Sequence, residues 1–262
     1  MPRSALMTVM ARAVLAAGKG MRRDFNEVEQ LQVSIKGPAD FVSAADRRAE
    51  ETIRRELEKA RPGYGFLMEE AGEIPGTDAE HRWIVDPLDG TTNFLHGMPH
   101  FAISVALERA GNIVAGIIYN PATDELYTAE RGQGAYFNDR RIRVAARQKL
   151  RESVIACGIP FMGHGEHDTF RAELAKVQAQ VAGVRRFGSA ALDLAWVASG
   201  RFDGYWERHL QAWDIAAGLL LVKEAGGYVS DAWGGQKMLE TGTVVAGNET
   251  IQRDLLRLVG KV

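Results

Sequence analysis

The feature that most limits how this chain can fold is a change of sequence pattern near residue 145. Between Phe101 and Val144, short β-like runs alternate with turns at Gly111-Asn112, Asn120-Pro121 and Gly132. The runs are FAISVAL, IVAGIIY, LYTA and GAYF. Short runs rich in β-branched and aromatic residues, separated by turn residues, predict an antiparallel sheet.

Beyond about residue 150, strand-like and helix-like runs alternate. The expected strands are SVIAC, VRRF, GYW and VVAG, and the expected helices cover residues 170–181, 190–198 and 213–225 and the C-terminus. This alternation is typical of an α/β structure with helices covering a sheet. No Pro-, Gly- or Ser-rich linker divides the chain. We therefore expect one domain over residues 1–262, with an α+β half of about 1–145 and an α/β half of 146–262.

Two helices are predicted ahead of the sheets. The first has apolar residues at helical spacing. Arg12 interrupts its apolar stretch, which is then too short for the hydrophobic region of a secretory signal. Its apolar positions are Leu6, Val9, Met10, Ala13 and Val14. The second has an apolar stripe at Ala49, Ile53 and Leu57 and ends at Pro62-Gly63. Both are therefore expected to be amphipathic.

Composition excludes several classes of protein. With 262 residues, 46% of them hydrophobic, the chain can bury a large core. A net charge of -2 argues against a general polyanion binder, so a nucleic-acid partner is not expected. The single cysteine, Cys157, cannot form an internal disulfide and suits a reducing compartment, which favours the cytoplasm. No apolar run approaches about 18 residues, so no membrane span is expected.

Four acidic residues stand at predicted strand ends or helix starts. Glu69 follows the strand at 65–68, Asp86 and Asp89 follow the strand at 83–85, and Asp214 lies in the first turn of the helix at 213–225. Singly, each is ordinary, since acidic residues are common on surfaces, in turns and at helix N-termini. Together they predict an open oxygen-ligand site for Mg²⁺. Residues 90–93 follow as a helix start whose N–H groups could bind an anion.

Four segments resemble the inositol monophosphatase family, in the family's order and over nearly the whole chain. WIVDPLDGTTNFLHGMPHFAISVAL resembles its signature and WDIAAGLLLVKEAGG its second, C-terminal signature, while ADFVSAAD and GFLMEEAGE resemble two further elements. The resemblance implies a layered αβαβα fold shared with fructose-1,6-bisphosphatases. It also implies a lithium-sensitive phosphatase activity and a homodimer.

The resemblance assigns metal-binding and catalytic roles residue by residue. The family's metal ligands match Glu69, Asp86, the Leu88 carbonyl, Asp89 and Asp214. Asp46 matches a carboxylate near a further, weaker metal, and Thr91 matches a hydroxyl that positions the attacking water. We therefore expect two or three Mg²⁺ ions, with Glu69, Thr91 and Asp46 serving catalysis.

Substrate contacts are implied in the same way. Glu207, seven residues before Asp214, matches a residue that touches the substrate's hydroxyl groups, and Gly188-Ser189-Ala190, preceded by Arg185 and Arg186, matches the loop beside the ring. The full expected set is Asp89, Gly90, Thr91, Thr92, Arg185, Gly188, Ser189, Ala190, Glu207 and Asp214. These residues predict hydrolysis of inositol monophosphate, or a similar small polyol phosphate, by a metal-activated water.

Two alternatives stay open. The first keeps the chemistry and changes the substrate to fructose 1,6-bisphosphate, histidinol phosphate or a nucleotide phosphate. The second is a regulatory protein that binds RNA or the transcription machinery, suggested by a basic segment. Its residues are Arg140, Arg141, Arg143, Arg147, Lys149 and Arg151. A solvated strand edge explains these charges as well.

Overall fold

The computed structural model describes residues 3–27, 33–37 and 40–260. Its helices are α1 (Ala5–Asn26), α2 (Ala44–Ala60), α3 (Thr91–Leu95), α4 (His167–Gln178), α5 (Ala190–Ala198), α6 (Ala212–Glu224), α7 (Met238–Thr241) and α8 (Glu249–Val259), with a 3-10 turn, η2 (Leu150–Glu152). Its strands are β1 (Val33–Gly37), β2 (Asp40–Ser43), β3 (Tyr64–Met68), β4 (Gly72–Ile74), β5 (Asp78–Asp89), β6 (Ala102–Arg109), β7 (Asn112–Asn120), β8 (Glu125–Glu130), β9 (Gly134–Phe137), β10 (Arg140–Arg141), β11 (Val154–Cys157), β12 (Gly183–Arg185), β13 (Gly204–Glu207), β14 (Tyr228–Ser230) and β15 (Val244–Gly247). None of these helices is both long and apolar enough to cross a bilayer.

In the described part of the chain, β1 and β2 form a hairpin and eight strands form the larger sheet, in the order β10-β9-β8-β7-β6-β5-β3-β4. The predicted antiparallel pairing over residues 101–144 is confirmed, and β3 lies parallel to β5. β5 is longer at both ends than the predicted strand at 83–85, because it pairs with β6 from His81 onward and pairs again at Asp89 after an irregularity that follows Asp86. Pro87 has no N–H to donate to a ladder, so a local break accommodates it.

The second sheet has the order β12-β11-β13-β15-β14 within the described residues. β12, β11 and β13 run parallel, and β15 is antiparallel to β13 and β14. Parallel strands present their carboxyl ends at one edge of a sheet, where α/β proteins bind ligands. Arg185, Cys157 and Glu207 are the last residues of these three strands and therefore mark that edge.

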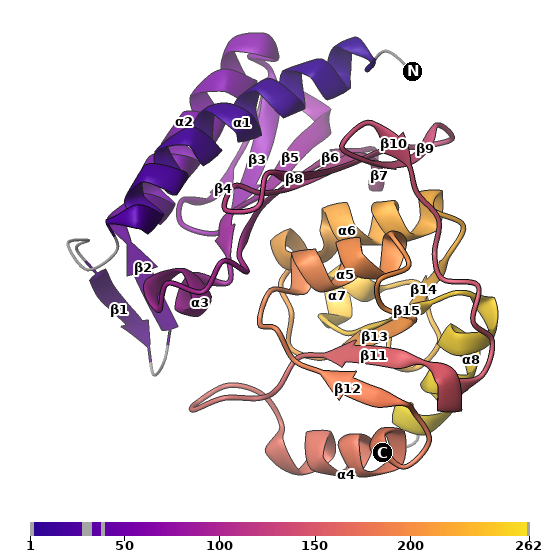
Figure 1. Cartoon of the computed structure of the whole chain (residues 1–262). Coiled ribbons are helices and arrows are strands. Elements are labelled where there is room, and N and C mark those ends of the chain that lie inside the picture. The colour runs from indigo at the N-terminus through magenta and orange to yellow at the C-terminus, as the bar shows by residue number, and fades with distance from the viewer. Residues whose placement is uncertain (1–2, 28–32, 38–39, 261–262) are drawn as a thin grey trace.

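The elements stack in five layers, as Figure 1 shows. α1 and α2 cover the outer face of the larger sheet, α5 and α6 lie between the two sheets, and α4 and α8 cover the outer face of the smaller one. Strand alternation divides the core accordingly: Ile84 packs toward α5 and α6, whereas Trp83 and Val85 pack toward α1 and α2. The layered αβαβα fold expected from the sequence is confirmed.

Most predicted elements are confirmed within a few residues, and α5 has the predicted bounds. The helix expected at 170–181 begins and ends three residues earlier. β4, β14 and α7 were not predicted, because each has only three or four residues and depends on its tertiary neighbours. Cys157 is buried in the core.

Candidate active site

The predicted acidic residues converge at the carboxyl ends of β3 and β5 and in the first turn of α6. β3 and β5 are parallel neighbours, so Glu69, directly after β3, lies beside the end of β5 that carries Asp86 and Asp89. The Glu69 N–H donates to the Val85 carbonyl at 3.2 Å. Asp214 is the third residue of α6, and Ser104 of β6 donates to the Trp213 carbonyl at 3.2 Å. The start of α6 is thereby fixed against the larger sheet.

Hydrogen bonds hold three of the carboxylates in place. Asp86 Oδ1 accepts from the Leu88 N–H at 2.9 Å. Asp89 Oδ2 accepts from Ser189 Oγ at 2.6 Å and from the Ala191 N–H at 2.7 Å. The two halves of the chain are therefore joined at Asp89.

Asp214 belongs to a capping box at the start of α6. Its Oδ2 accepts from the Gln211 N–H at 2.7 Å, while the Gln211 side chain accepts from the backbone of Asp214. For Asp214 and Asp89 alike, these bonds use Oδ2 and not Oδ1. In each of these two carboxylates, Oδ1 takes no part in the bonds described.

The cluster concentrates negative charge in a poorly solvated place. Burial raises the pKa of Asp86 well above its usual value, and the neighbouring Glu69, Asp89 and Asp214 carboxylates raise it further. Burial, followed by the charge of Asp89, also raises the pKa of Asp214. For Asp89, burial outweighs its hydrogen bonds and raises the pKa to about 6. Protons or cations are needed to offset this repulsion.

The donor set has the chemistry that a hard cation prefers, because every candidate ligand is an oxygen. Among the described residues, however, no three His, Cys, Asp or Glu side chains are arranged to hold a metal ion together. The carboxylates of Asp86, Asp89 and Asp214 are instead oriented by the hydrogen bonds that they accept. The donors are Leu88, Ser189, Ala191 and Gln211. The residues fit Mg²⁺ by donor type and by mutual repulsion, rather than by a preformed cage.

α3 starts beside the acidic cluster. Gly90, its N-cap, has φ of 91°, and a Cβ there would lie 3.1 Å from the His100 carbonyl oxygen and 3.2 Å from that of Gly188. Only glycine combines this left-handed conformation with such close backbone packing. Thr91 and Thr92 form the first turn, where N–H groups point out of the helix start. The predicted helix start is confirmed, although α3 has only five residues.

Thr91 links the Leu88 carbonyl with α2. Its Oγ1 donates to the Leu88 carbonyl oxygen at 3.0 Å and lies 3.4 Å from Asp46 Oδ1. Asp46 is buried in the first turn of α2. It ends the ADFVSAAD segment, in which Ala39 and the side chains of residues 40–43 lie outside the described part of the chain. The structure thus brings Asp46, Leu88 and Thr91 together.

The predicted substrate loop lies next to these residues. Asn93 of α3 donates through Nδ2 to the His100 and Phe187 carbonyls at 2.7 Å each and to the Gly188 carbonyl at 3.4 Å. Ser189 is the N-cap of α5 and Ala190 its first residue. Gly188, Ser189 and Ala190 are therefore held close to Gly90 and Asp89.

Glu207 ends β13 and faces the same region. Burial raises its pKa to about 7, an effect opposed by a hydrogen bond from Tyr205 and strengthened by the charge of Asp89. Arg186 lowers that pKa, so its charge lies close enough to act on Glu207. Arg185 is exposed and donates to its own neighbour, the Val184 carbonyl, at 2.9 Å. Both arginines are exposed, and the charge of Arg186, rather than that of the predicted Arg185, acts on Glu207.

Sequence reasoning also missed Tyr205, Asp193 and Gly158. Tyr205 is fully buried and donates to Glu207 Oε2. Asp193, on α5, is 1% exposed, and its Oδ1 has no hydrogen-bond partner within the described residues. Burial, followed by the charge of Glu207, raises its pKa well above the usual range. The two-residue spacing of Tyr205 and Glu207 on one strand was the only available signal.

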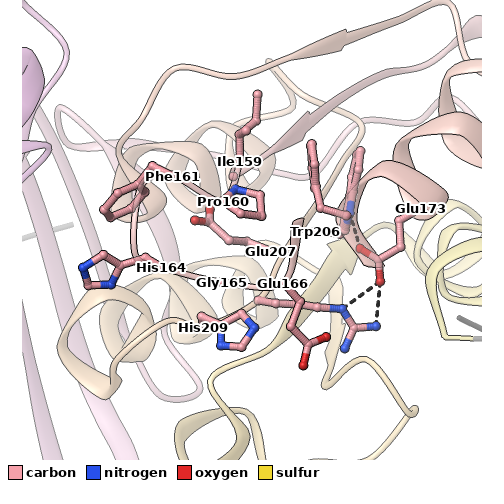
Figure 2. A pocket seen from close by; sticks show the side chains of 13 residues that line it. Ile159, Pro160, Phe161, His164, Gly165, Glu166, Glu173, Trp206, Glu207 and His209 are labelled. Carbon is pink, nitrogen blue, oxygen red and sulfur yellow. Dashed lines mark hydrogen bonds and ion pairs between the residues drawn. The ribbon is translucent and has the colours of Figure 1, made fainter. Parts of the chain in front are cut away.

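A cavity of about 90 Å³ adjoins Glu207 and is lined by the segment 158–166 and by residues of β13 and α4. Figure 2 shows Glu207 extending toward the part of that segment that carries Ile159 and Pro160. On another wall, Glu173 accepts from Trp206 Nε1 at 3.1 Å and from Arg208 Nε at 2.7 Å. Of the predicted site residues, only Glu207 lines this cavity.

Comparison with known proteins agrees with the geometry. A sequence model of the inositol monophosphatase family matches residues 3–262. An inositol-1-monophosphatase of Mesorhizobium japonicum is 67% identical over 261 residues, which cover 100% of this chain and 98% of the relative. A Nus factor SuhB of Pseudomonas aeruginosa is 42% identical over 258 residues, covering 97% of this chain and 95% of the relative.

A solved structure is also very similar. The crystal structure of the extragenic suppressor protein SuhB from Bartonella henselae has a TM-score of 0.96 and 59% identity, and the match covers 98% of this chain and 99% of that one. Family, fold and the placement of the acidic residues all lead to one conclusion. This chain belongs to the inositol monophosphatase family and is a phosphatase.

Proposed function

We propose that this phosphatase hydrolyses inositol monophosphate, or a similar small polyol phosphate, with Mg²⁺ as its cofactor. The observation that carries the proposal is the convergence of Glu69, Asp86, Asp89 and Asp214 beside the start of α3. A buried carboxylate, that of Asp86, repelled by three partly buried ones favours a divalent cation, and an adjacent helix start favours a phosphate.

Glu69, Asp86 and the Leu88 carbonyl would hold one ion, and Asp86, Asp89 and Asp214 a second, with Asp46 near a third. When bound, Mg²⁺ would neutralise phosphate oxygens, acidify water and stabilise the leaving oxygen. Ser189 and the Ala191 N–H, which bond Asp89 Oδ2, would keep that carboxylate oriented.

Thr91 and Glu69 would orient the attacking water. The Thr91 hydroxyl donates a hydrogen bond to the Leu88 carbonyl. The lone pairs of Thr91 Oγ1 can therefore accept a hydrogen bond from water. A carboxylate of Glu69 can accept the second. The N–H groups of Gly90, Thr91 and Thr92 would receive the phosphate at the start of α3, on the side facing Asp89.

The leaving group would lie between the α5 loop and Glu207. Glu207 can accept hydrogen bonds from neighbouring hydroxyls, and Gly188, Ser189 and Ala190, held by Asn93 and Asp89, would form the opposite wall. Arg186, near Glu207, adds a positive charge on the same side. This polar surface suits a polyhydroxy alcohol better than an apolar one.

The proposal is tested by phosphate release from inositol 1-phosphate, fructose 1,6-bisphosphate, histidinol phosphate, a nucleotide and p-nitrophenyl phosphate, each with and without Mg²⁺. Inositol phosphate or another polyol monophosphate should have the highest kcat/KM. Turnover should stop in EDTA, return with Mg²⁺ and fall with Li⁺. Full turnover in EDTA would refute the metal assignment, and a clear preference for the nucleotide would refute the substrate.

A contact with RNA or the transcription machinery is a second candidate, favoured by the relative named Nus factor SuhB. The basic segment gives it limited support, because β10 is a sheet edge and Arg147 pairs with buried Asp203 at 2.6 Å. Lys149 and Arg151 both lie near Glu152. We expect no retention of RNA at about 150 mM salt, whereas salt-sensitive retention would favour this candidate.

The assembly and location complete the proposal. A homodimer is expected from the family resemblance, and sedimentation velocity would measure it. A cytoplasmic location is supported by the single, buried Cys157, which has no partner for an internal disulfide. Fractionation of cells would test it.

A further inference from the structure

The carboxylate of Glu207 occupies a space that the glycine at the end of the neighbouring strand leaves open. β11 and β13 are parallel, with Cys157 opposite Trp206, so Gly158 lies beside Glu207. A Cβ built on Gly158 would lie 1.8 Å from Glu207 Cδ, 1.9 Å from Oε1 and 2.2 Å from Oε2. Any larger residue at this position would therefore displace the carboxylate.

The other side of the carboxylate is held by a phenol. Tyr205 and Glu207 are two residues apart on β13, so their side chains leave the same face of the sheet. Tyr205 is 0% exposed, and its hydroxyl donates to Glu207 Oε2. Burial raises the pKa of Tyr205 well above its usual value, so the phenol keeps the proton that it donates.

We infer that Gly158 and Tyr205 are positioning residues that hold the Glu207 carboxylate in place and thereby determine the preference for polyol leaving groups. Gly158 supplies the space and Tyr205 the hydrogen bond. A carboxylate already held in one orientation loses little conformational entropy when substrate hydroxyls bind. The inference rests on the proposed function, because Glu207 matters only if the leaving group carries hydroxyls.

Two variants test this without removing Glu207. Tyr205→Phe deletes the donor and keeps the buried ring. Gly158→Ala adds a methyl group whose close neighbours are atoms at the end of a flexible side chain, and Gly158 does not have a positive φ. The carboxylate can therefore move aside, so the variant should fold.

The measurement is the ratio of kcat/KM for inositol 1-phosphate to that for p-nitrophenyl phosphate. Each variant should lower the ratio about tenfold, the lower end of what a charged acceptor contributes, and leave the aryl ester within about twofold. In a Glu207→Gln background neither change should lower the ratio further, since the carboxylate that they position is then absent.

Matched controls exist elsewhere in the chain. Tyr127 is also fully buried and donates to a glutamate two residues away on its strand, Glu125, at 3.0 Å. Gly20, in α1, has open space where a Cβ would stand. Tyr127→Phe and Gly20→Ala should leave the ratio unchanged.

The outcomes separate the inference from the proposed function. If wild-type protein does not hydrolyse polyol phosphates, both are overturned. If Glu207→Gln lowers the ratio but Tyr205→Phe and Gly158→Ala do not, the positioning role is overturned and the proposed function stands. Equal losses on both esters would assign Tyr205 and Gly158 to the general stability of the site and would also overturn the inference.

Discussion

The Asp86→Asn variant should be at least as stable as wild type without Mg²⁺ and less stable than wild type with it. Asp86 is 2% exposed and is repelled by Glu69, Asp89 and Asp214. A carboxyl group whose pKa is raised in the folded protein costs stability once the pH exceeds its unfolded value. Asn removes that cost and can still accept from the Leu88 N–H. In EDTA at neutral pH, the variant should therefore melt no lower than wild type.

With Mg²⁺ the order should reverse. An ion at about 100 times its Kd stabilises the folded state by about 2.7 kcal/mol. For 262 residues the entropy of unfolding is about 0.55 kcal/mol per kelvin, so the Tm of wild type should rise by about 5 °C. Loss of a direct ligand should weaken Mg²⁺ binding by the variant at least about 100-fold. The ion then stabilises the folded variant by only about 0.4 kcal/mol, so its Tm should rise by less than about 1 °C.

Differential scanning calorimetry in EDTA and in a Mg²⁺ series would measure both effects. Asp168→Asn, which changes an exposed carboxylate on α4, is the matched control and should respond to Mg²⁺ as wild type does. An equal rise in Tm for Asp86→Asn and wild type would refute Asp86 as a ligand. No rise in wild type at millimolar Mg²⁺ would refute the metal site itself.

Three further predictions concern single side chains. Thr91→Ala should lower kcat about 10²–10³-fold with little change in KM, because a water-orienting hydroxyl acts mainly in the transition state; a change confined to KM would assign Thr91 to binding. Glu207→Gln should lower kcat/KM for inositol phosphate about 10- to 150-fold and spare p-nitrophenyl phosphate, and equal losses would remove Glu207 from leaving-group recognition. Asp193→Asn should have a higher Tm than wild type, and the difference should grow as the pH rises above about 4. The reason is that a carboxyl group with a raised pKa destabilises the folded state once the pH exceeds its unfolded pKa. A difference in Tm that does not change with pH would contradict this prediction.

Local sequence patterns predicted the elements that carry their own signal. α5 combines an N-cap serine with a run that is apolar except for Asp193, and Ser189 accepts from the Leu192 N–H, so its bounds could be predicted. β5 was predicted too short, because its pairing after Asp86 depends on β6. β4 and β14 have three residues each and no periodicity of their own. Such strands are defined by their partners.

The acidic cluster was predictable in part. Glu69, Asp86 and Asp89 were predicted at the ends of two buried strands, and the parallel pairing of β3 with β5 brings these two strand ends together. The bond between Asp89 and Ser189 joins residues 100 positions apart. No local pattern specifies a contact of that length.

By itself, the sequence determined most helices and strands and the resemblance to the family, which in turn implied the layered fold and the roles of the acidic residues, because hydrophobic periodicity and short motifs are local properties. Only the tertiary structure decided which side chains share a site. It brought the charge of Arg186 close enough to act on Glu207, and it placed Gly158 and Tyr205 around that carboxylate. The physical reason is that these contacts depend on the pairing of β11 with β13 and on how neighbouring strands present their ends, neither of which local spacing determines.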